Sequence, residues 1–135
     1  MAIHHLLDLV NFGLVILIWL VQLIIYPSLA HVDDSEFIGW HRRYVRRITI
    51  LVGPLMTAQM LLLLWAVRRE LIPANVLMLG GAAVIWLSSA VYSVPCHLKL
   101  QQTGRDRRVI HRLVRTNWIR TILWSAVFVT GLARG

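Results

Sequence analysis

The stretch RTNWIRTILW, Arg115 to Trp124, decides how many helices of this chain can cross a membrane. The apolar run that continues from it, Ile122 to Ala133, has only 12 residues, which form about 18 Å of helix at 1.5 Å per residue. A hydrocarbon core requires roughly 20 residues. A crossing helix therefore has to begin near Leu113, and this start brings Arg120 into the membrane or to its boundary.

The composition of the chain indicates a membrane protein. Of 135 residues, 58% are hydrophobic and only 15% are charged, whereas a soluble domain has roughly 25% charged residues. Mean hydropathy is +0.67. A soluble fold of this size could not bury so much apolar surface, so lipid is the expected solvent for most of the chain. The single cysteine, Cys96, excludes an internal disulfide framework and a CxxC motif.

Three further apolar runs are long enough to cross a bilayer as helices. Pro27 stands at the end of the first run, and Pro73 opens the third. Asp33 or Asp34 is expected to cap the helix ahead of the second run, and with Asp33 as the cap Glu36 falls at the third position, as in a capping box. The expected fold is all-α, a single domain over residues 1–135 that forms an integral membrane four-helix bundle. Its expected spans are residues 6–28, 42–67, 72–97 and 113–133.

Basic residues predict the orientation of the bundle. Ten basic residues lie either between spans one and two or between spans three and four, and only three lie on the opposite side. Arg120 is not included in this count. The positive-inside rule places the side with ten in the cytoplasm and both termini outside. The chain has a net charge of +8. Because its basic residues flank lipid, they predict contact with anionic lipid headgroups and no nucleic acid as partner.

The polar residues of the fourth span form a single stripe. Asn117, Arg120, Thr121 and Trp124 are spaced i, i+3, i+4 and i+7, which is one helix face. Such a face is expected to turn away from lipid. In the second span His41, Tyr44 and Gln59 share a stripe as well, since Gln59 lies five full turns beyond His41.

Arg120 leaves three interpretations open. An arginine at the centre of a membrane helix costs roughly 2.5 to 3.5 kcal/mol. It could extend to the cytoplasmic headgroups, pair with a loop carboxylate or with a carbonyl freed by Pro95, or bind an anionic or polar ligand. Among the four spans only Asp8 carries a carboxylate, and it lies near the opposite face.

His41 and His97 are expected at matching depths on neighbouring helices. Two histidines on facing helices of a bundle can hold a haem or a transition metal. The sequence has no HExxH motif and no acidic third ligand nearby. Each histidine could therefore have another role instead of metal or haem binding. It could form a hydrogen bond to a ligand, or it could be an incidental surface residue.

Four segments carry a resemblance to known proteins: YPSL at 26–29, WHRRYVRRITILVGPLM at 40–56, VPCHLKL at 94–100 and LVRTNWIRTILW at 113–124. They resemble a small family of bacterial four-helix membrane proteins whose activity is not known, and the likeness covers nearly the whole chain. It implies the bacterial inner membrane. The overall plan more distantly resembles anthrone oxygenase-like membrane proteins, which would imply oxygenation of an aromatic polyketide.

Two functions are consistent with these patterns. In the first, the cytoplasmic end of the bundle binds a lipophilic ligand such as a quinone or polyketide, with redox or oxygenase-like chemistry. His41, His97 and Arg120 would be the catalytic residues, with both histidines as metal ligands if a metal is bound. The ligand-binding residues would be Asn117, Tyr44, Tyr26, Trp118 and Gln59.

In the second function the chain is a non-catalytic accessory or structural subunit. Its polar residues would then lock helices together. A homo-oligomer fits either function. A transporter is disfavoured, because proton coupling needs a carboxylate in the middle of the membrane and these spans have none there.

Overall fold

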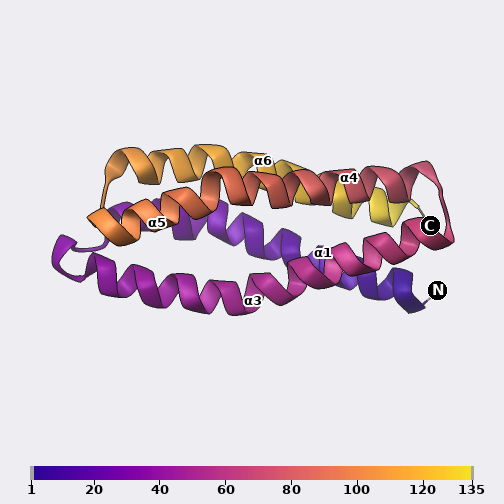
Figure 1. Cartoon of the computed structure of the whole chain (residues 1–135), viewed down its shortest axis with the longest axis horizontal. Coiled ribbons are helices and arrows are strands. Elements are labelled where there is room, and N and C mark those ends of the chain that lie inside the picture. Colours follow the sequence, from indigo (N-terminus) through magenta and orange to yellow (C-terminus); the bar gives the residue numbers. More distant parts are fainter. Residues whose placement is uncertain (1, 135) are drawn as a thin grey trace.

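The structure is a computed structural model that describes residues 2–134, all of its regular elements being helical. Figure 1 shows four antiparallel rods, with the described chain ends together at one end of the molecule. The first rod consists of α1 (Ala2–Leu20), η1 (Val21–Ile25), α2 (Tyr26–Ser28) and η2 (Leu29–His31), and the second is α3 (Asp34–Arg69). The third consists of α4 (Pro73–Ser88), η3 (Ser89–Ser93) and α5 (Val94–Thr103), and the fourth is α6 (Arg107–Ala133).

Three of the four rods, Ala2–His31, Asp34–Arg69 and Pro73–Thr103, are long and apolar enough to cross a membrane. The fourth, α6, has 27 residues and is about 40 Å long, but Asn117 and Arg120 lower its hydropathy. All four helices extend beyond the spans expected from the sequence. Because α6 begins at Arg107 rather than near Leu113, Arg120 is its central residue.

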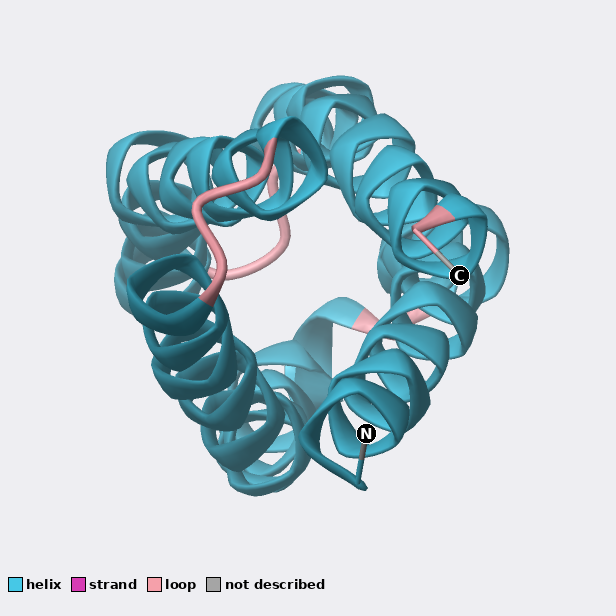
Figure 2. Cartoon of the chain, turned by 90° about the vertical axis from the view of Figure 1, so that its right-hand side faces the viewer, coloured by secondary structure: helices cyan, strands magenta, loops and turns pink. Residues whose placement is uncertain are grey.

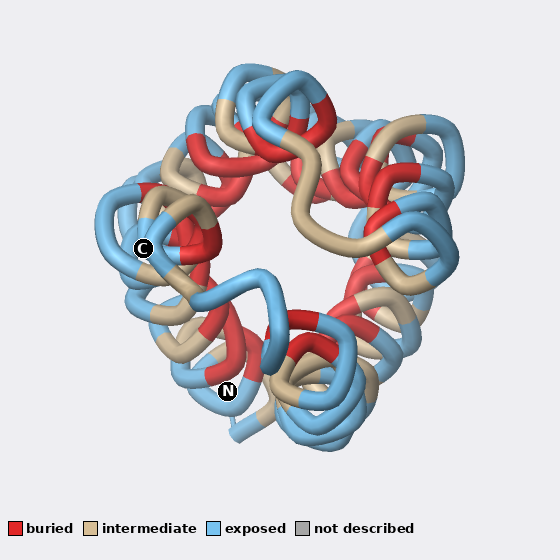
Figure 3. Tube along the Cα trace, turned by 90° about the vertical axis from the view of Figure 1, so that its left-hand side faces the viewer, coloured by how far each residue is buried: buried red, intermediate tan, exposed pale blue. Residues whose placement is uncertain are grey.

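The interior of the bundle is mainly apolar but contains several buried polar residues, and its outer surface carries many exposed apolar side chains. Leu9, Ile50 and Leu77 are 68%, 65% and 69% exposed, and an apolar surface of this extent is a lipid-facing or partner-facing surface. Seen along the bundle, the rods surround a common interior (Figure 2), and the buried residues line their inner sides (Figure 3). The buried polar residues are Asn11, Gln22, His41, Gln59, Asn75, Ser88, Ser93, Asn117, Arg120 and Thr121.

Two loops meet at the end of the bundle away from the termini, which is called the loop end below. Asp33 caps α3 by accepting a hydrogen bond from the Ser35 N–H (3.4 Å), and Asp106 caps α6 by accepting one from the Arg108 N–H (2.9 Å). Gly104 adopts φ = 83° between α5 and α6, a conformation that favours glycine. Of the two caps considered from the sequence, Asp33 and Asp34, the structure has Asp33.

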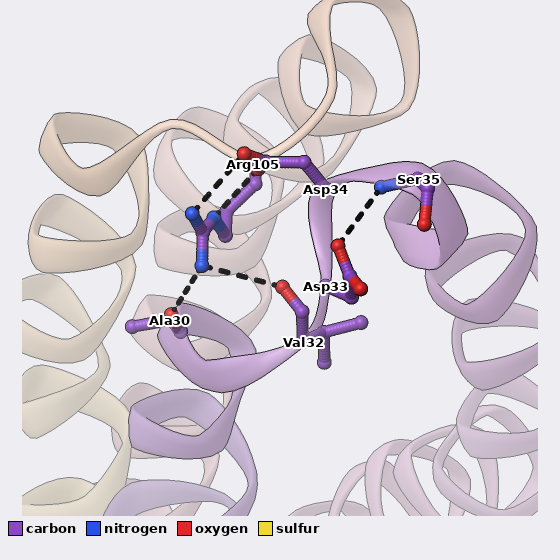
Figure 4. A network of polar contacts seen from close by, with 6 residues as sticks. All are labelled: Ala30, Val32, Asp33, Asp34, Ser35 and Arg105. Carbon is purple, nitrogen blue, oxygen red and sulfur yellow. Dashed lines mark hydrogen bonds and ion pairs between the residues drawn. The ribbon is translucent and has the colours of Figure 1, made fainter.

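Arg105 joins these two loops (Figure 4). Its Nη1 donates to the Ala30 carbonyl (2.9 Å) and the Val32 carbonyl (3.3 Å), and its Nε lies 2.8 Å from an oxygen of Asp34. The guanidinium thereby links the start of α6 to the turn between η2 and α3. This contact fixes the rods that surround the site described below.

The first and third rods each contain a π-helical turn just before a proline. The Tyr26 N–H bonds to the Val21 carbonyl, and the Val94 N–H bonds to the Ser89 carbonyl, in both cases five residues back. Pro27 and Pro95 follow directly. Proline has no N–H, and its ring crowds the carbonyl four residues earlier, so a wider turn accommodates it. The extra residue in each turn also rotates the following helix about its axis.

Candidate functional site

A cavity of about 580 Å³ lies inside the bundle between its middle and its loop end. Every rod contributes to its wall. Most of the wall is apolar, and its polar residues are Tyr26, His41, Arg42, Tyr44, Thr49, Ser89, Ser93, His97, Gln101 and Arg120. The apolar contributors include Leu14, Ile18 and Val21 of the first rod, Ile48, Val52 and Met56 of α3, Val94 and Leu98 of α5, and Trp124 of α6.

The cavity opens sideways between α3 and the third rod. Trp86, Ala90, Val94 and Leu98, four residues apart, form one edge of the opening and are exposed. Thr49 of α3 lines the cavity and is also exposed. In Figure 1, α3 and the third rod lie farthest apart near the middle of the molecule and approach each other toward the loop end. The opening therefore faces the same apolar surroundings as the outer surface of the helices.

Arg120 reaches the cavity wall from the centre of α6. The residue is only 7% exposed. Its Nη1 donates to Ser89 Oγ (3.3 Å), and its Nη2 donates to Tyr26 Oη (3.2 Å) and to Asn117 Oδ1. The Arg120 Nε–H is buried without a partner. Arg120 therefore does not extend to the headgroups, which excludes the first interpretation of this residue.

No carboxylate neutralises Arg120 among residues 2–134. The ion pairs in this part of the chain join Arg105 to Asp34 and Arg134 to Asp8, and neither involves the cavity. The loop acids and the carbonyl expected near Pro95 are not its partners. The cavity therefore has a buried guanidinium charge in its wall that only neutral oxygens contact, a costly arrangement in a low-dielectric interior.

A layer of amides behind Arg120 sets its position. Asn117 Nδ2 donates to Gln22 Oε1 (2.9 Å), and Thr121 Oγ1 donates to the same oxygen (2.9 Å). Gln22 Nε2 donates to the Val114 carbonyl (3.0 Å). This arrangement leaves Asn117 Oδ1 to accept from Arg120. Asn117, expected to bind ligand, lies behind the cavity wall and holds the guanidinium instead.

A chain of hydrogen bonds leads from Arg120 toward the loop end. Tyr26 Oη lies 3.1 Å from His97 Nε2, and His97 Nδ1 lies 2.9 Å from His41 Nε2. His41 Nδ1 lies 3.0 Å from Gln101 Oε1, and Gln101 Nε2 donates to the Ile38 carbonyl (3.4 Å). The histidines predicted to sit at matching depths are thus in direct contact.

The two ends of the chain fix the direction of every bond in it. The guanidinium of Arg120 can only donate, and the Ile38 carbonyl can only accept. Gln101 Oε1 therefore accepts from His41 Nδ1–H. With neutral imidazoles, His97 Nδ1–H donates to His41 Nε2, and Tyr26 O–H donates to His97 Nε2. All the N–H and O–H groups point from Arg120 toward the loop end.

The histidine pair is occupied by hydrogen bonds on both rings. All four ring nitrogens of His41 and His97 have partners. Residues 2–134 contain no group of three or more His, Cys, Asp or Glu side chains able to hold a metal ion. A metal bound by these two histidines would have to displace at least one of their bonds. The geometry favours proton donation and acceptance over ligation.

Besides Asn117, two further residues expected to bind ligand, Trp118 and Gln59, lie outside the cavity wall. Trp118 is 38% exposed and packs edge to face on Trp19, on the outer surface. It lies 200° around α6 from Arg120 and therefore points away from the interior. Gln59 is buried, but it donates to Asn11 Oδ1 (2.7 Å) and accepts from Trp124 Nε1 (3.1 Å) deeper in the bundle. Tyr44 and Tyr26 do line the cavity.

Sequence reasoning missed Gln22, Ser89 and Gln101. Gln22 is a lone amide in an apolar run, so its polarity within a span was a usable signal. In the sequence, Ser89 indicates only a packing residue, because small residues are common at helix contacts in membranes. Gln101 lies beyond the expected end of the third span. Its role becomes visible only because α5 continues to Thr103.

Comparisons of the chain with family models, with curated proteins and with solved structures find no match. The cavity, Arg120 and the hydrogen-bond chain are therefore the features that bear on function.

Proposed function

We propose that this chain binds a lipophilic ligand that carries an anionic or carbonyl oxygen, with that oxygen held by Arg120. The observation that carries the proposal is the buried guanidinium in an apolar cavity wall, with its Nε–H unpaired and no carboxylate contact. Quinones and aromatic polyketides, the ligand classes considered from the sequence, have such oxygens.

Electrostatics favours an oxygen ligand at this position. An opposite charge about 4 Å from a guanidinium contributes on the order of 4 kcal/mol at an effective dielectric constant of about 20. This value is comparable to the roughly 2.5 to 3.5 kcal/mol that an arginine costs at the centre of a membrane helix. The Nε–H of Arg120 is fully buried without a partner, which adds to the cost of burying this side chain. Binding would then offset much of the cost of burying Arg120.

The shape of the cavity favours a ligand with an apolar tail. Its volume of about 580 Å³ lies in the range of small-molecule sites, about 300 to 1,000 Å³. Most of the wall is apolar, and the opening lies between membrane-facing helix edges rather than at a loop. Such a ligand would enter from the bilayer, and both its apolar tail and its oxygen-bearing head would pass through the sideways opening.

The proposed location is the bacterial inner membrane, with the loop end in the cytoplasm. The basic residues around the loop end support this orientation through the positive-inside rule. Arg42, Arg108 and Arg112 belong to this basic set. Tyr26, His97 and His41 would then lie between the ligand and the cytoplasmic interface.

The test is direct binding of two chemically defined probes to the purified chain in nanodiscs. Decylubiquinone offers carbonyl oxygens, and dodecanoate offers a carboxylate. Arg120→Gln is expected to weaken the binding of at least one probe by roughly 10- to 100-fold, since a hydrogen bond to a charged group contributes about 1.5 to 3 kcal/mol. Arg115→Gln, an exposed change on the same helix, should bind like the unaltered chain.

An accessory subunit is the second candidate, and the buried amides favour it. Gln22, Asn117 and Thr121 bond the first rod to α6, which is what a purely structural role requires. On this alternative, neither probe binds the unaltered chain, and Arg120→Gln changes only its thermal stability. That result would refute the proposed ligand site.

A further inference from the structure

We infer that Tyr26, His97 and His41 form a proton relay that accepts the proton of a weakly acidic ligand bound at Arg120. The inference rests on the proposed ligand site and narrows its ligand to an oxygen acid of the phenol or hydroquinone class. Such a ligand would arrive neutral and be held as its anion.

Entry from the membrane and binding at Arg120 make opposite demands on the ligand. A charged head is strongly disfavoured in hydrocarbon, so the form that reaches the sideways opening is the neutral one. The buried guanidinium favours the anion once the head is in place. A ligand that meets both demands has to lose a proton inside the cavity. The structure provides a neighbouring base system connected to that position.

The transfer is balanced within the chain of hydrogen bonds. The ligand O–H donates its proton to Tyr26 Oη, while the proton of Tyr26 moves to His97 Nε2 across 3.1 Å. The Nδ1 proton of His97 moves to His41 Nε2 across 2.9 Å. Tyr26 and His97 end neutral, the ligand becomes an oxyanion beside Arg120, and His41 becomes an imidazolium. No oxidant or reductant takes part.

Charge and hydrogen bonding favour His41 as the end of the relay. His97 is separated from the Arg120 guanidinium by a single phenol, whereas His41 is one residue farther along the chain. Like-charge repulsion therefore disfavours an imidazolium on His97 more than on His41. The His41 Nδ1–H already donates to Gln101 Oε1, an acceptor suited to the charged ring.

Two tyrosines and an arginine also lie near His41. Tyr44 lies on the same helix with its ring centroid 6.4 Å from that of His41, and Tyr26 approaches from α2 through His97. Arg42, also in the cavity wall, is exposed. None of these groups is a carboxylate. The oxyanion of the ligand would thus be the negative charge that compensates an imidazolium on His41.

The test uses the full chain in nanodiscs, with nitrogen-15 in its histidines, and 2-decyl-4-nitrophenol as the probe. The probe has an apolar tail, and its phenolate form is yellow. Nitrogen-15 resonance distinguishes the two neutral tautomers of histidine from imidazolium.

Before addition of the probe, both His41 and His97 should carry their proton on Nδ1. After addition, the bound probe should be ionised about one pH unit or more below the pH required in empty nanodiscs, a tenfold change, and His41 alone should become imidazolium.

Tyr26→Phe removes the first link of the relay but keeps the ring. This variant should still bind the yellow form at Arg120, while the imidazolium signal of His41 is lost. Tyr92→Phe, a tyrosine outside the cavity wall, is the matched control and should behave like the unaltered chain. His41→Gln assigns the resonance.

The outcomes separate the relay from the ligand site. If the unaltered chain binds phenolate but His41 stays neutral, or if Tyr26→Phe leaves the imidazolium signal in place, the relay is refuted and the ligand site stands. A proton found on Nε2 of either histidine before addition also refutes the relay. If the probe does not bind in either form, the proposed ligand site fails and the relay fails with it.

Discussion

The amide of Gln22 joins the first and last rods in the interior of the bundle. Its carbonyl accepts from both Asn117 and Thr121, and its N–H₂ donates to the Val114 carbonyl. Gln22 thereby also fixes Asn117, which orients Arg120. The residue is 2% exposed, so water cannot take over these bonds. Gln22 therefore stabilises the fold directly. It affects the ligand site only indirectly, by fixing the residue that orients Arg120.

Gln22→Met tests this role, since methionine has a similar length and no strong hydrogen-bonding group. The change removes an acceptor of Asn117 Nδ2 and one of the two acceptors of Thr121 Oγ1, and an unsatisfied buried group costs about 1 to 3 kcal/mol. We expect a lower thermal unfolding temperature in detergent. Gln102→Met, at an exposed position of α5, is the control and should unfold like the unaltered chain.

At the scale of single helices, α4 and α6 pack closely at Gly81. A Cβ atom added at Gly81 would lie 2.9 Å from Val127 Cγ2, whereas one added at Gly80 would meet nothing within 4 Å. The two adjacent glycines therefore have different surroundings. Gly81 permits close approach of two helices, as small residues do in membranes, and Gly80 faces open space.

Gly81→Ala and Gly80→Ala form a matched pair for this contact. Both replacements gain helix propensity, but only the first crowds a neighbouring side chain. We expect Gly81→Ala to be less stable than Gly80→Ala by about 1 to 3 kcal/mol. Denaturation monitored by helix content measures the difference. Equal stability of the two variants would show that α4 and α6 adjust without cost.

The helices also show which features the sequence could predict. The stripe of Asn117, Arg120, Thr121 and Trp124 is buried, as its spacing predicts. His41 and Gln59 are likewise buried on one face of α3. The π-helical turns were not predictable in this way, because a regular 100° repeat assumes that no residue is inserted. The partners Gln22, Ser89 and Gln101 lie on the two rods that contain those turns, so periodicity alone could not bring them to the site.

At the scale of the whole molecule, the asymmetry of basic residues predicts the orientation in the membrane. The structure gathers the loops of residues 32–33 and 104–106 at one end, where Arg105 joins them. The described chain ends lie at the other end (Figure 1). An orientation prediction made for one loop therefore applies to both.

Reporter fusions at the C-terminus test this orientation in bacterial cells. We expect alkaline phosphatase fused there to be active, because it requires export, and a fused green fluorescent protein to stay dark. Moving the same reporters to the loop around Gly104 should exchange the two results. A fluorescent C-terminal fusion would place the loop end outside and would contradict the positive-inside assignment.

Because the cavity opens sideways between α3 and the third rod, its occupancy depends on the concentration of the ligand in the membrane. A guest molecule that arrives through the hydrocarbon is present at a mole fraction among the lipids, and this quantity, rather than its molarity in the buffer, sets how much of the cavity is filled. Adding empty vesicles would dilute the guest and lower occupancy even at constant total volume. Concentrating or diluting the whole suspension, with protein, lipid and guest in fixed ratio, would leave occupancy nearly unchanged for a strongly partitioning compound.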